Sequence, residues 1–215
     1  FEPELQLGRI GRGYRDPFGV DADTKQGSCN VDVVCPAADA WRDEVQSVAL
    51  YSISGYLTCS GTMVADTLHS GRPLLLTAYH CRVTQANDQT VVTYWNYHSP
   101  TCGQLGGGSL AQSLSGATLL ARREDNDLCL LELEDAPPEE FGVFWAGWDR
   151  RLDHIPQGSV AIHHPGTDEK AISFNDDPLT VRSNCLLDGD TTTHWEVDNW
   201  EIGTTEVGSS GSGLW

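Results

Sequence analysis

The chain has 215 residues and a mass of 23.4 kDa, and 39% of its residues are hydrophobic, which suits one large all-β domain or two small lobes. Its 13 basic and 31 acidic residues give a formal net charge of −18. That charge argues against nucleic acid and anionic membranes as partners and favours cationic substrates. The sequence has no apolar run long enough to span a membrane and does not open with a signal peptide, so we expect that Phe1 is not the native start.

Residues 1–28 are rich in Gly, Arg and Asp and show little apolar periodicity, so we expect an N-terminal extension or the remnant of a pro-region. From residue 29 to residue 135, short apolar or alternating runs separated by Gly, Asn and Ser predict the strands of a first β lobe. The expected strands are Val31–Val34, Ser47–Leu57, Thr62–Ala65, Pro73–Ala78, Thr90–Tyr97, Ala117–Ala121 and Leu128–Leu133.

Two prolines and several acids over residues 135–140 predict a boundary, after which residues 136–215 form a second β lobe. Its expected strands are Val143–Trp148, Ser159–His163, Ala171–Phe174 and Thr192–Val197. No long helix is expected. The pattern predicts an all-β protein with two lobes.

The seven cysteines are widely spaced and form no Cys-x-x-Cys pair, which favours disulfides over a tetrahedral zinc site. Disulfides imply an oxidising compartment, so we expect a secreted, extracellular protein. The odd count requires at least one free thiol or a partner cysteine outside this chain. The cysteines are Cys29, Cys35, Cys59, Cys81, Cys102, Cys129 and Cys185.

A serine flanked by glycines, Ser210, lies between Gly208 and Gly211 near the end of the chain. Such a turn can expose a hydroxyl and direct backbone amides at a reacting carbonyl, although a Gly/Ser run also suits a flexible tail. His80 follows the apolar run Leu74–Leu76, and Asp127 directly precedes the apolar run Leu128–Leu133. Each of these two residues, taken alone, also suits a structural role at the end of a strand.

The order His80, Asp127, Ser210 is the chain order of the chymotrypsin triad. Thr77-Ala78-Tyr79-His80-Cys81, Asp127-Leu128 and Gly208-Ser209-Ser210-Gly211-Ser212 resemble the catalytic blocks of chymotrypsin-fold serine peptidases. The closer resemblance is to the bacterial lysyl endopeptidases, the group of Achromobacter protease I. It extends over further blocks, which are Ser28–Pro36, Val92–Tyr97, Phe144–Arg151 and Ala161–Pro165.

The resemblance implies a chymotrypsin-like double β-barrel whose second barrel is incomplete at its C-terminal end. It implies that His80 is the general base, that Asp127 orients it and that Ser210 is the nucleophile. The backbone N–H groups of Gly208 and Ser210 would form the oxyanion hole. No cofactor and no metal are required. The expected partners are protein or peptide substrates, and we expect a monomer.

The resemblance also implies the disulfides Cys59–Cys81 and Cys35–Cys102, and a partner for Cys29 beyond Trp215. Cys129 and Cys185 depart from the family pattern, and we interpret Cys129 as a buried thiol.

Cleavage after lysine is implied by the resemblance alone. The acid that recognises lysine in the family follows the nucleophile, beyond Trp215, and Thr204, which lies where trypsin has its pocket acid, is neutral. Ser209 stands where pancreatic enzymes have the aspartate that pairs with a new N-terminus. We therefore hypothesise self-cleavage after Lys25, one of only two lysines in the chain.

Two other functions are open at this stage. A triad-bearing fold can be a non-catalytic binding module, with Trp95, Trp145 and Trp148 as an adhesive face. A metal-dependent hydrolase could use His163 and His164, but adjacent residues of a strand point to opposite faces, which disfavours joint ligation. We expect a packing role for His194 and Trp195. A serine endopeptidase with a different specificity is a further alternative.

Overall fold

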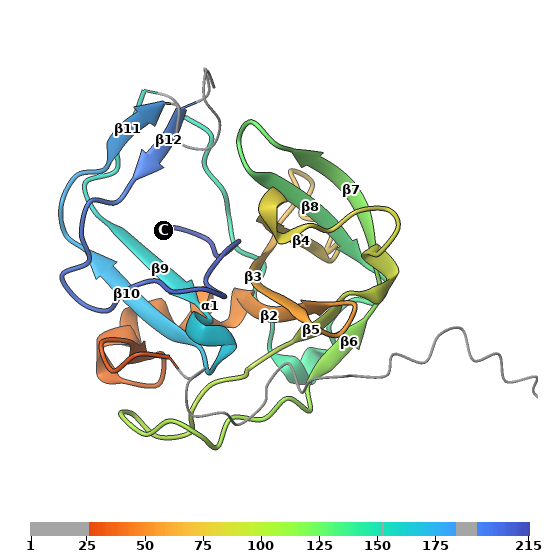
Figure 1. Ribbon diagram of the computed structural model, residues 1–215, viewed down its shortest axis with the longest axis horizontal. Helices are drawn as coiled ribbons and strands as arrows, with labels where there is room; N and C mark the ends of the chain where they lie inside the picture. The colour runs from red at the N-terminus through yellow and green to blue at the C-terminus, as the bar shows by residue number, and fades with distance from the viewer. Residues whose placement is uncertain (1–25, 152, 184–192) are drawn as a thin grey trace, which may run out of the picture.

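The computed structural model describes residues 26–151, 153–183 and 193–215, and places them in two β lobes (Figure 1). The first lobe is a seven-stranded antiparallel sheet in the order β6-β5-β2-β3-β4-β8-β7. In chain order its strands are β2 (Val48–Ile53), β3 (Leu57–Val64), β4 (Leu74–Ala78), β5 (Val92–Tyr94), β6 (Ser113–Ser115), β7 (Ala117–Arg123) and β8 (Leu128–Leu133).

The core of this lobe follows from the pattern of its strands. Every residue of β2 is buried, and β8 alternates between buried and partly exposed positions, as expected for a strand with one face on a core. Side chains from β2, β3, β4 and β8 meet in one apolar cluster. Its largest members include Tyr51, Met63, Leu75, Trp95 and Leu131.

The second lobe contains a three-stranded antiparallel sheet and a separate hairpin. The sheet has the order β1 (Val31–Asp32), β10 (Ala171–Asn175) and β9 (Ser159–His163), and the hairpin pairs β11 (Thr180–Ser183) with β12 (Thr193–Glu196). The backbone of Trp215 exchanges two hydrogen bonds with Val160 of β9. A second apolar cluster lies here, and residues 33–48 contribute to it together with β9 and β10. The domain boundaries expected from the sequence remain predictions.

The helices in the described part of the chain are short. They are α1 (Arg42–Ser47) and five 3₁₀ segments, η1 (Pro36–Trp41), η2 (Tyr79–Cys81), η3 (Asp88–Thr90), η4 (Glu139–Phe141) and η5 (Pro165–Thr167). No helix among the described residues is both long enough and apolar enough to cross a membrane.

One expected strand is absent from the described structure. Residues 143–148 run alongside the first lobe without entering a sheet, and only Ala146 bridges to Val64 of β3. Their alternating apolar side chains, Val143 and Trp145 among them, instead pack on the outside of the first core. The strand expected at Val143–Trp148 is therefore wrong, because side-chain packing with backbone pairing at a single residue, Ala146, produces the same alternation.

Both disulfide pairs implied by the family resemblance are present. Cys35 is bonded to Cys102, and Cys59 of β3 is bonded to Cys81 of η2. Cys129 is a buried free thiol whose pKa is raised to about 11 by burial, whereas the free thiol of Cys29 is exposed. Cys185 lies outside the described residues.

Candidate active site

His80 is held by Asp127 at two points. The apolar strand β4 ends at Ala78 and the chain turns into η2, which places His80 at the edge of the first lobe. Asp127 precedes β8, the neighbour of β4, and its carboxylate accepts from the backbone N of His80 at 2.9 Å and contacts Nδ1 of the ring at 2.6 Å. Its own carbonyl accepts from the backbone N of Tyr79. Asp127 therefore fixes both the backbone and the ring of His80.

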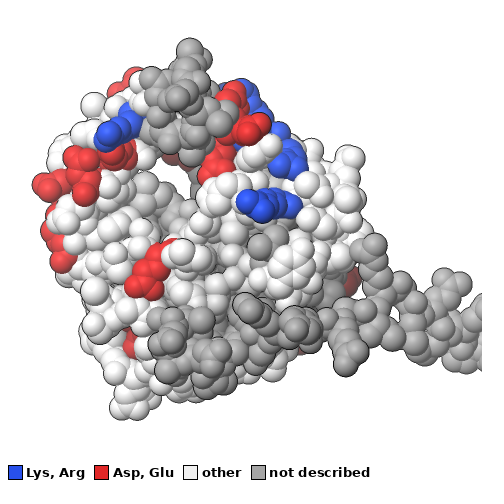
Figure 2. Space-filling model, in the orientation of Figure 1, with Lys and Arg blue, Asp and Glu red and all other residues white. Residues whose placement is uncertain are grey.

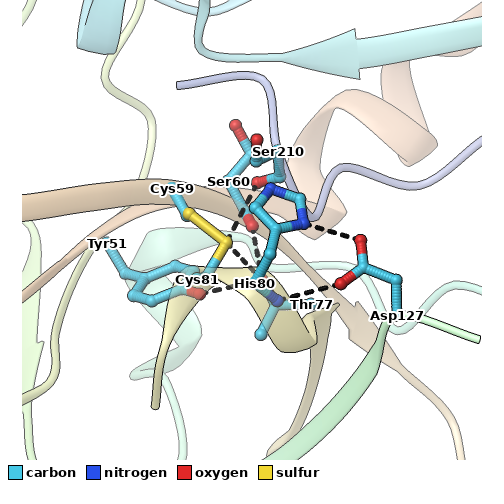
Figure 3. Close-up of polar contacts among 8 residues, drawn as sticks. All are labelled: Tyr51, Cys59, Ser60, Thr77, His80, Cys81, Asp127 and Ser210. Carbon is cyan, nitrogen blue, oxygen red and sulfur yellow. Dashed lines mark hydrogen bonds and ion pairs between the residues drawn. A yellow bond between two sulfur atoms is a disulfide. The ribbon is translucent and has the colours of Figure 1, made fainter. Parts of the chain in front are cut away.

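Ser210 lies in a turn that is anchored to the first lobe from the second. We call residues 206–212 the serine turn. Within it the amide of Ser209 donates to the carbonyl of Glu206, and the amide of Ser212 donates to that of Ser209. Ser60 of β3 holds the turn twice, because its amide donates to the carbonyl of Ser210 and its hydroxyl donates to the carbonyl of Gly208, each at 2.8 Å. Figure 3 shows Ser210 and Asp127 on either side of the His80 ring.

The two glycines of the serine turn are required by its geometry. Gly208 has φ +96°, and a Cβ there would lie 2.7 Å from the carbonyl oxygen of His164. Gly211 has φ +84°, and a Cβ there would lie 2.1 Å from Oγ1 of Thr77 and 2.4 Å from the carbonyl oxygen of Ser60. Both a positive φ and the absence of a side chain are needed at these positions. The turn is thus a specific structure and not a flexible tail.

Buried polar contacts fix the wall behind the turn. Thr77 Oγ1 donates to the carbonyl of Ser60, and the hydroxyl of Tyr51 therefore donates to Thr77 Oγ1 at 2.9 Å. Tyr51 is fully buried, and burial raises its pKa far above the usual value. The Cys59–Cys81 disulfide joins the residues next to Ser60 and His80 (Figure 3). The base and the turn are therefore attached to one rigid frame.

The backbone amides of Gly208 and Ser210, expected to form an oxyanion hole, donate no hydrogen bond to any described residue. Likewise, no hydrogen bond between described residues joins the His80 ring to the Ser210 hydroxyl. Catalytic hydrogen bonds are often long before a substrate is bound. A cavity of about 330 Å³ is lined by Ala78, Asp127, His194 and Gly211 among other residues, so it borders Asp127 and the residue after Ser210, but neither His80 nor Ser210 lines it.

A buried histidine, His163, supports the serine turn from the second lobe. Its Nδ1 lies 2.7 Å from Oγ of Ser209, and its Nε2 lies 3.1 Å from Oγ of Ser173. The Ser173 hydroxyl donates to the carbonyl of Thr204, so Nε2 of His163 must be the donor to Ser173, and Nδ1 then accepts from Ser209. Burial lowers the pKa of His163 to about 4, which keeps the ring neutral.

The pair His163 and His164 does not form a joint site. Nδ1 of His164 donates to the carbonyl of Asp168 at 2.9 Å, and its ring stacks on Tyr97. The two rings therefore have separate partners. No group of three or more potential metal ligands occurs among the described residues.

No sequence pattern points to Ser60 or Glu206 as parts of this site, and His163 stands out only as one of two adjacent histidines in a block that the family shares. Ser60 is one of several small or hydroxyl-bearing residues of β3, and His163 lies in a strand whose five residues are all buried. Ser60 and His163 are revealed by their contacts with Gly208 and Ser209, and Glu206 by its contacts with Gly27 and Ser209.

A family model for the C-terminal domain of lysyl endopeptidase matches residues 24–215. The chain is also 36% identical over 217 residues to a lysyl endopeptidase of Pseudomonas aeruginosa, an alignment that covers 94% of this chain. The chain belongs to the lysyl endopeptidase family. It spans 44% of the length of this curated relative.

Solved structures share the fold of this family member. The thermostable serine protease AL20 is similar with a TM-score of 0.55 and 15% identity over 80% of this chain and 79% of that one. Deg5 is similar with a TM-score of 0.52 and 18% identity over 83% and 78%. At this identity the likeness concerns the fold, and it confirms the all-β, chymotrypsin-like architecture expected from the sequence.

Proposed function

We propose that this member of the lysyl endopeptidase family is a secreted serine endopeptidase that cleaves peptide bonds after lysine. The observation that carries the proposal is the two-point hold of Asp127 on His80 beside a serine turn anchored by Ser60. Asp127 is bonded to His80, and Ser210 lies across the His80 ring from Asp127 (Figure 3). This arrangement of residues from three distant segments supports acyl transfer.

In the proposed reaction Oγ of Ser210 attacks the carbonyl carbon of the scissile peptide while Nε2 of His80 takes its proton. The oxyanion that forms is stabilised by the free amides of Gly208 and Ser210. His80 then gives the proton to the leaving amine, and the acyl-enzyme remains on Ser210. A water molecule, deprotonated by His80, attacks the acyl carbon. The bond between that carbon and Oγ of Ser210 then breaks, Oγ takes the proton from His80, and the acid leaves. Asp127 keeps the proton on Nδ1 throughout and stabilises the imidazolium.

Lysine specificity is supported by the family and by electrostatics. The chain carries a net charge of −18, and acidic side chains gather along the outer edge of the lobe that holds β10 and β11 (Figure 2). Such a field attracts a cationic substrate. Thr204 takes no direct part in charge recognition, because it is neutral and its backbone is bonded to Ser173.

Secretion as a monomer is part of the proposal. Two disulfides favour an oxidising compartment, and the acidic surface disfavours binding to nucleic acid and anionic membranes. Recovery of the active protein from culture supernatant, and its elution at monomer mass, would test these points.

The test of the activity is to express the complete gene that contains this chain and to profile cleavage of a peptide library. Ser210→Ala should abolish cleavage and labelling by a serine-directed phosphonate, whereas Ser212→Ala, in the same turn, should retain both. Cleavage predominantly after residues other than lysine would refute the specificity but not the mechanism. A protein that binds its targets equally well with Ser210→Ala, and never cleaves them, would be a binding module.

A further inference from the structure

Of the two lysines in the chain, Lys170 is closed to self-cleavage. Lys170 is fully buried, and its Nζ donates to the carbonyl of Val45 at 2.7 Å. Its backbone amide and carbonyl are both bonded within the fold, to Tyr97 and Val33. A protease that requires lysine cannot reach it in the folded chain. If the enzyme cleaves after lysine, Lys25 is the remaining lysine at which it could cut this chain, and that cut would make Gln26 the new N-terminus.

The amide nitrogen of Gln26 already lies at a carboxylate. It is 3.4 Å from Oδ2 of Asp168, and Gln26 is only 5% exposed. Oδ1 of the same carboxylate accepts from the hydroxyl of Tyr97 and from the amide of Glu169, so Oδ2 is directed at Gln26. The side-chain amide of Gln26 donates to the carbonyl of Glu169 at 3.0 Å, which anchors the residue. Composition alone did not indicate this packing.

The next residue is bound to the serine turn. The amide of Gly27 donates to both carboxylate oxygens of Glu206, at 3.0 and 3.2 Å. A Cβ at Gly27 would lie 2.7 Å from Oε1 of Glu206, so glycine permits this close approach. The backbone of Glu206 in turn exchanges two hydrogen bonds with Ser209, since its amide donates to the Ser209 hydroxyl and its carbonyl accepts from the Ser209 amide. Ser209, the partner of Glu206 in this contact, directly precedes Ser210.

We infer that Asp168 is the receptor for the N-terminal ammonium group that cleavage after Lys25 creates, and that Glu206, which holds the amide of the next residue, passes the effect of its binding to the serine turn. This inference rests on the proposed function. Hydrolysis of the Lys25–Gln26 bond adds one water, leaves a carboxylate on Lys25 and an amine on Gln26, and the amine takes up a proton near neutral pH. A neutral amide N–H is thereby replaced by a cation at the same place.

Cleavage strengthens the contact between Gln26 and Asp168, because a charged donor replaces a neutral one at a partly buried site. A hydrogen bond between an ammonium and a carboxylate is shorter and roughly twice as strong as one between neutral groups. The cation also lies one residue from Gly27, whose contact with Glu206 leads to Ser209. Holding Glu206 in place keeps the amides of the serine turn directed at the substrate carbonyl. In pancreatic-type enzymes the residue before the nucleophile meets the new N-terminus, whereas here that residue is Ser209, and the acids lie at positions 168 and 206.

The test compares two enzymes that both lack the pro-region. A recognition sequence for a site-specific protease replaces the residues before Gln26, so that one form begins at Gln26 and the other carries one extra glycine before it. The two differ in the position of the ammonium and in that one residue. We expect kcat/KM for a lysyl ester to be roughly tenfold or more higher for the form that begins at Gln26, as one charged hydrogen bond would produce.

Side-chain variants locate the effect. In Asp168→Asn and in Glu206→Gln the ratio between the two forms should fall toward one, and in Glu140→Gln, an exposed acid of η4, it should stay as in the parent. Self-processed enzyme should have Gln26 at its N-terminus. Conversion of Gln26 to pyroglutamate, which removes the charge, should lower kcat/KM as the extra glycine does.

Equal rates for the two forms, or full activity of the pyroglutamate form, would overturn the inference while leaving the proposed protease intact. A self-processed enzyme that begins at another residue would also overturn it. If neither form hydrolyses the ester or reacts with the phosphonate, the proposed function itself fails, and the receptor with it.

Discussion

Nδ1 of His163 accepts a hydrogen bond from Oγ of Ser209 at 2.7 Å, and both residues are buried. Ser209 directly precedes the proposed nucleophile, so this contact fixes one side of the serine turn, as Ser60 fixes the other. His163→Ala leaves the Ser209 hydroxyl without its acceptor, and an unsatisfied buried group costs about 1–3 kcal/mol. We expect kcat to fall about tenfold or more, with KM nearly unchanged, in steady-state hydrolysis of a lysyl ester.

The pair should behave as a unit. Ser209→Ala should lower kcat by a similar factor, and the double variant should be little worse than either single one, because residues in one hydrogen-bond network are not additive. His69→Asn, in an exposed loop where φ is 49°, is the control and should retain parent activity. Independent, multiplicative losses would show that His163 does not act through Ser209.

Asp127→Asn tests the tautomer of His80. The amide oxygen can still accept from the backbone N of His80, but its NH₂ group then faces Nδ1, which places the ring proton on Nε2. A ring protonated at Nε2 cannot take the proton of Ser210, and in the template triad this change lowers kcat about 10⁴-fold. Burst kinetics with a lysyl ester would measure the loss. Asp125→Asn, two residues away and paired with Arg123, should retain activity, and an equal loss there would contradict the assignment.

The sequence-based strands match best where an apolar run is also a buried run. The bounds expected for β8, Leu128–Leu133, and β9, Ser159–His163, are the bounds observed, because these strands pack against a core along their length. The hairpin strand β11 and the short β6 were not expected, since their residues are mostly exposed and polar. The short helix α1, six residues long, also has no distinct periodic signal.

The residues of the candidate site also fall into those that a local sequence pattern indicates and those that it does not. His80, Asp127 and Ser210 could be named because each stands in a local pattern that acyl transfer requires and that the family shares. Ser60 could not, and His163 could be considered only as a metal ligand, because their partners in the serine turn lie 148 and 46 residues away in the chain. The supporting contacts depend on how the two lobes meet, and that relation has no local signature in the sequence.

Gly211→Ala tests the steric basis of the serine turn. The new Cβ would overlap the carbonyl oxygen of Ser60 and Oγ1 of Thr77, and the φ of +84° is unfavourable for alanine. We expect a loss of several kcal/mol in the free energy of unfolding, above the roughly 1–2 kcal/mol that the left-handed backbone alone costs. Thermal unfolding would measure it.

Two other glycines allow the steric cost of a new Cβ to be separated from the cost of the left-handed backbone. Gly55 has φ +76° with no atom near its Cβ position, so Gly55→Ala reports the backbone cost alone. Gly147 has open space and no positive φ, so Gly147→Ala should be close to neutral. A Gly211→Ala variant no less stable than Gly55→Ala would mean that the turn can move away from β3.

Lys170 should make stability depend on alkaline pH. Burial lowers its pKa from 10.5 to about 7 in the folded chain. Between these values the unfolded chain binds the proton and the folded chain does not, so the free energy of unfolding rises with pH in this window, by up to about 1.4 kcal/mol per pH unit. Below about pH 7 the buried lysine is charged in both states, and its full destabilising effect is present.

Lys170→Met cannot titrate, so its stability should rise less between pH 7 and pH 10. Urea unfolding of the Ser210→Ala protein, which avoids self-digestion, would compare the slopes with and without Lys170→Met, and parallel slopes would show that Lys170 titrates normally in the folded chain.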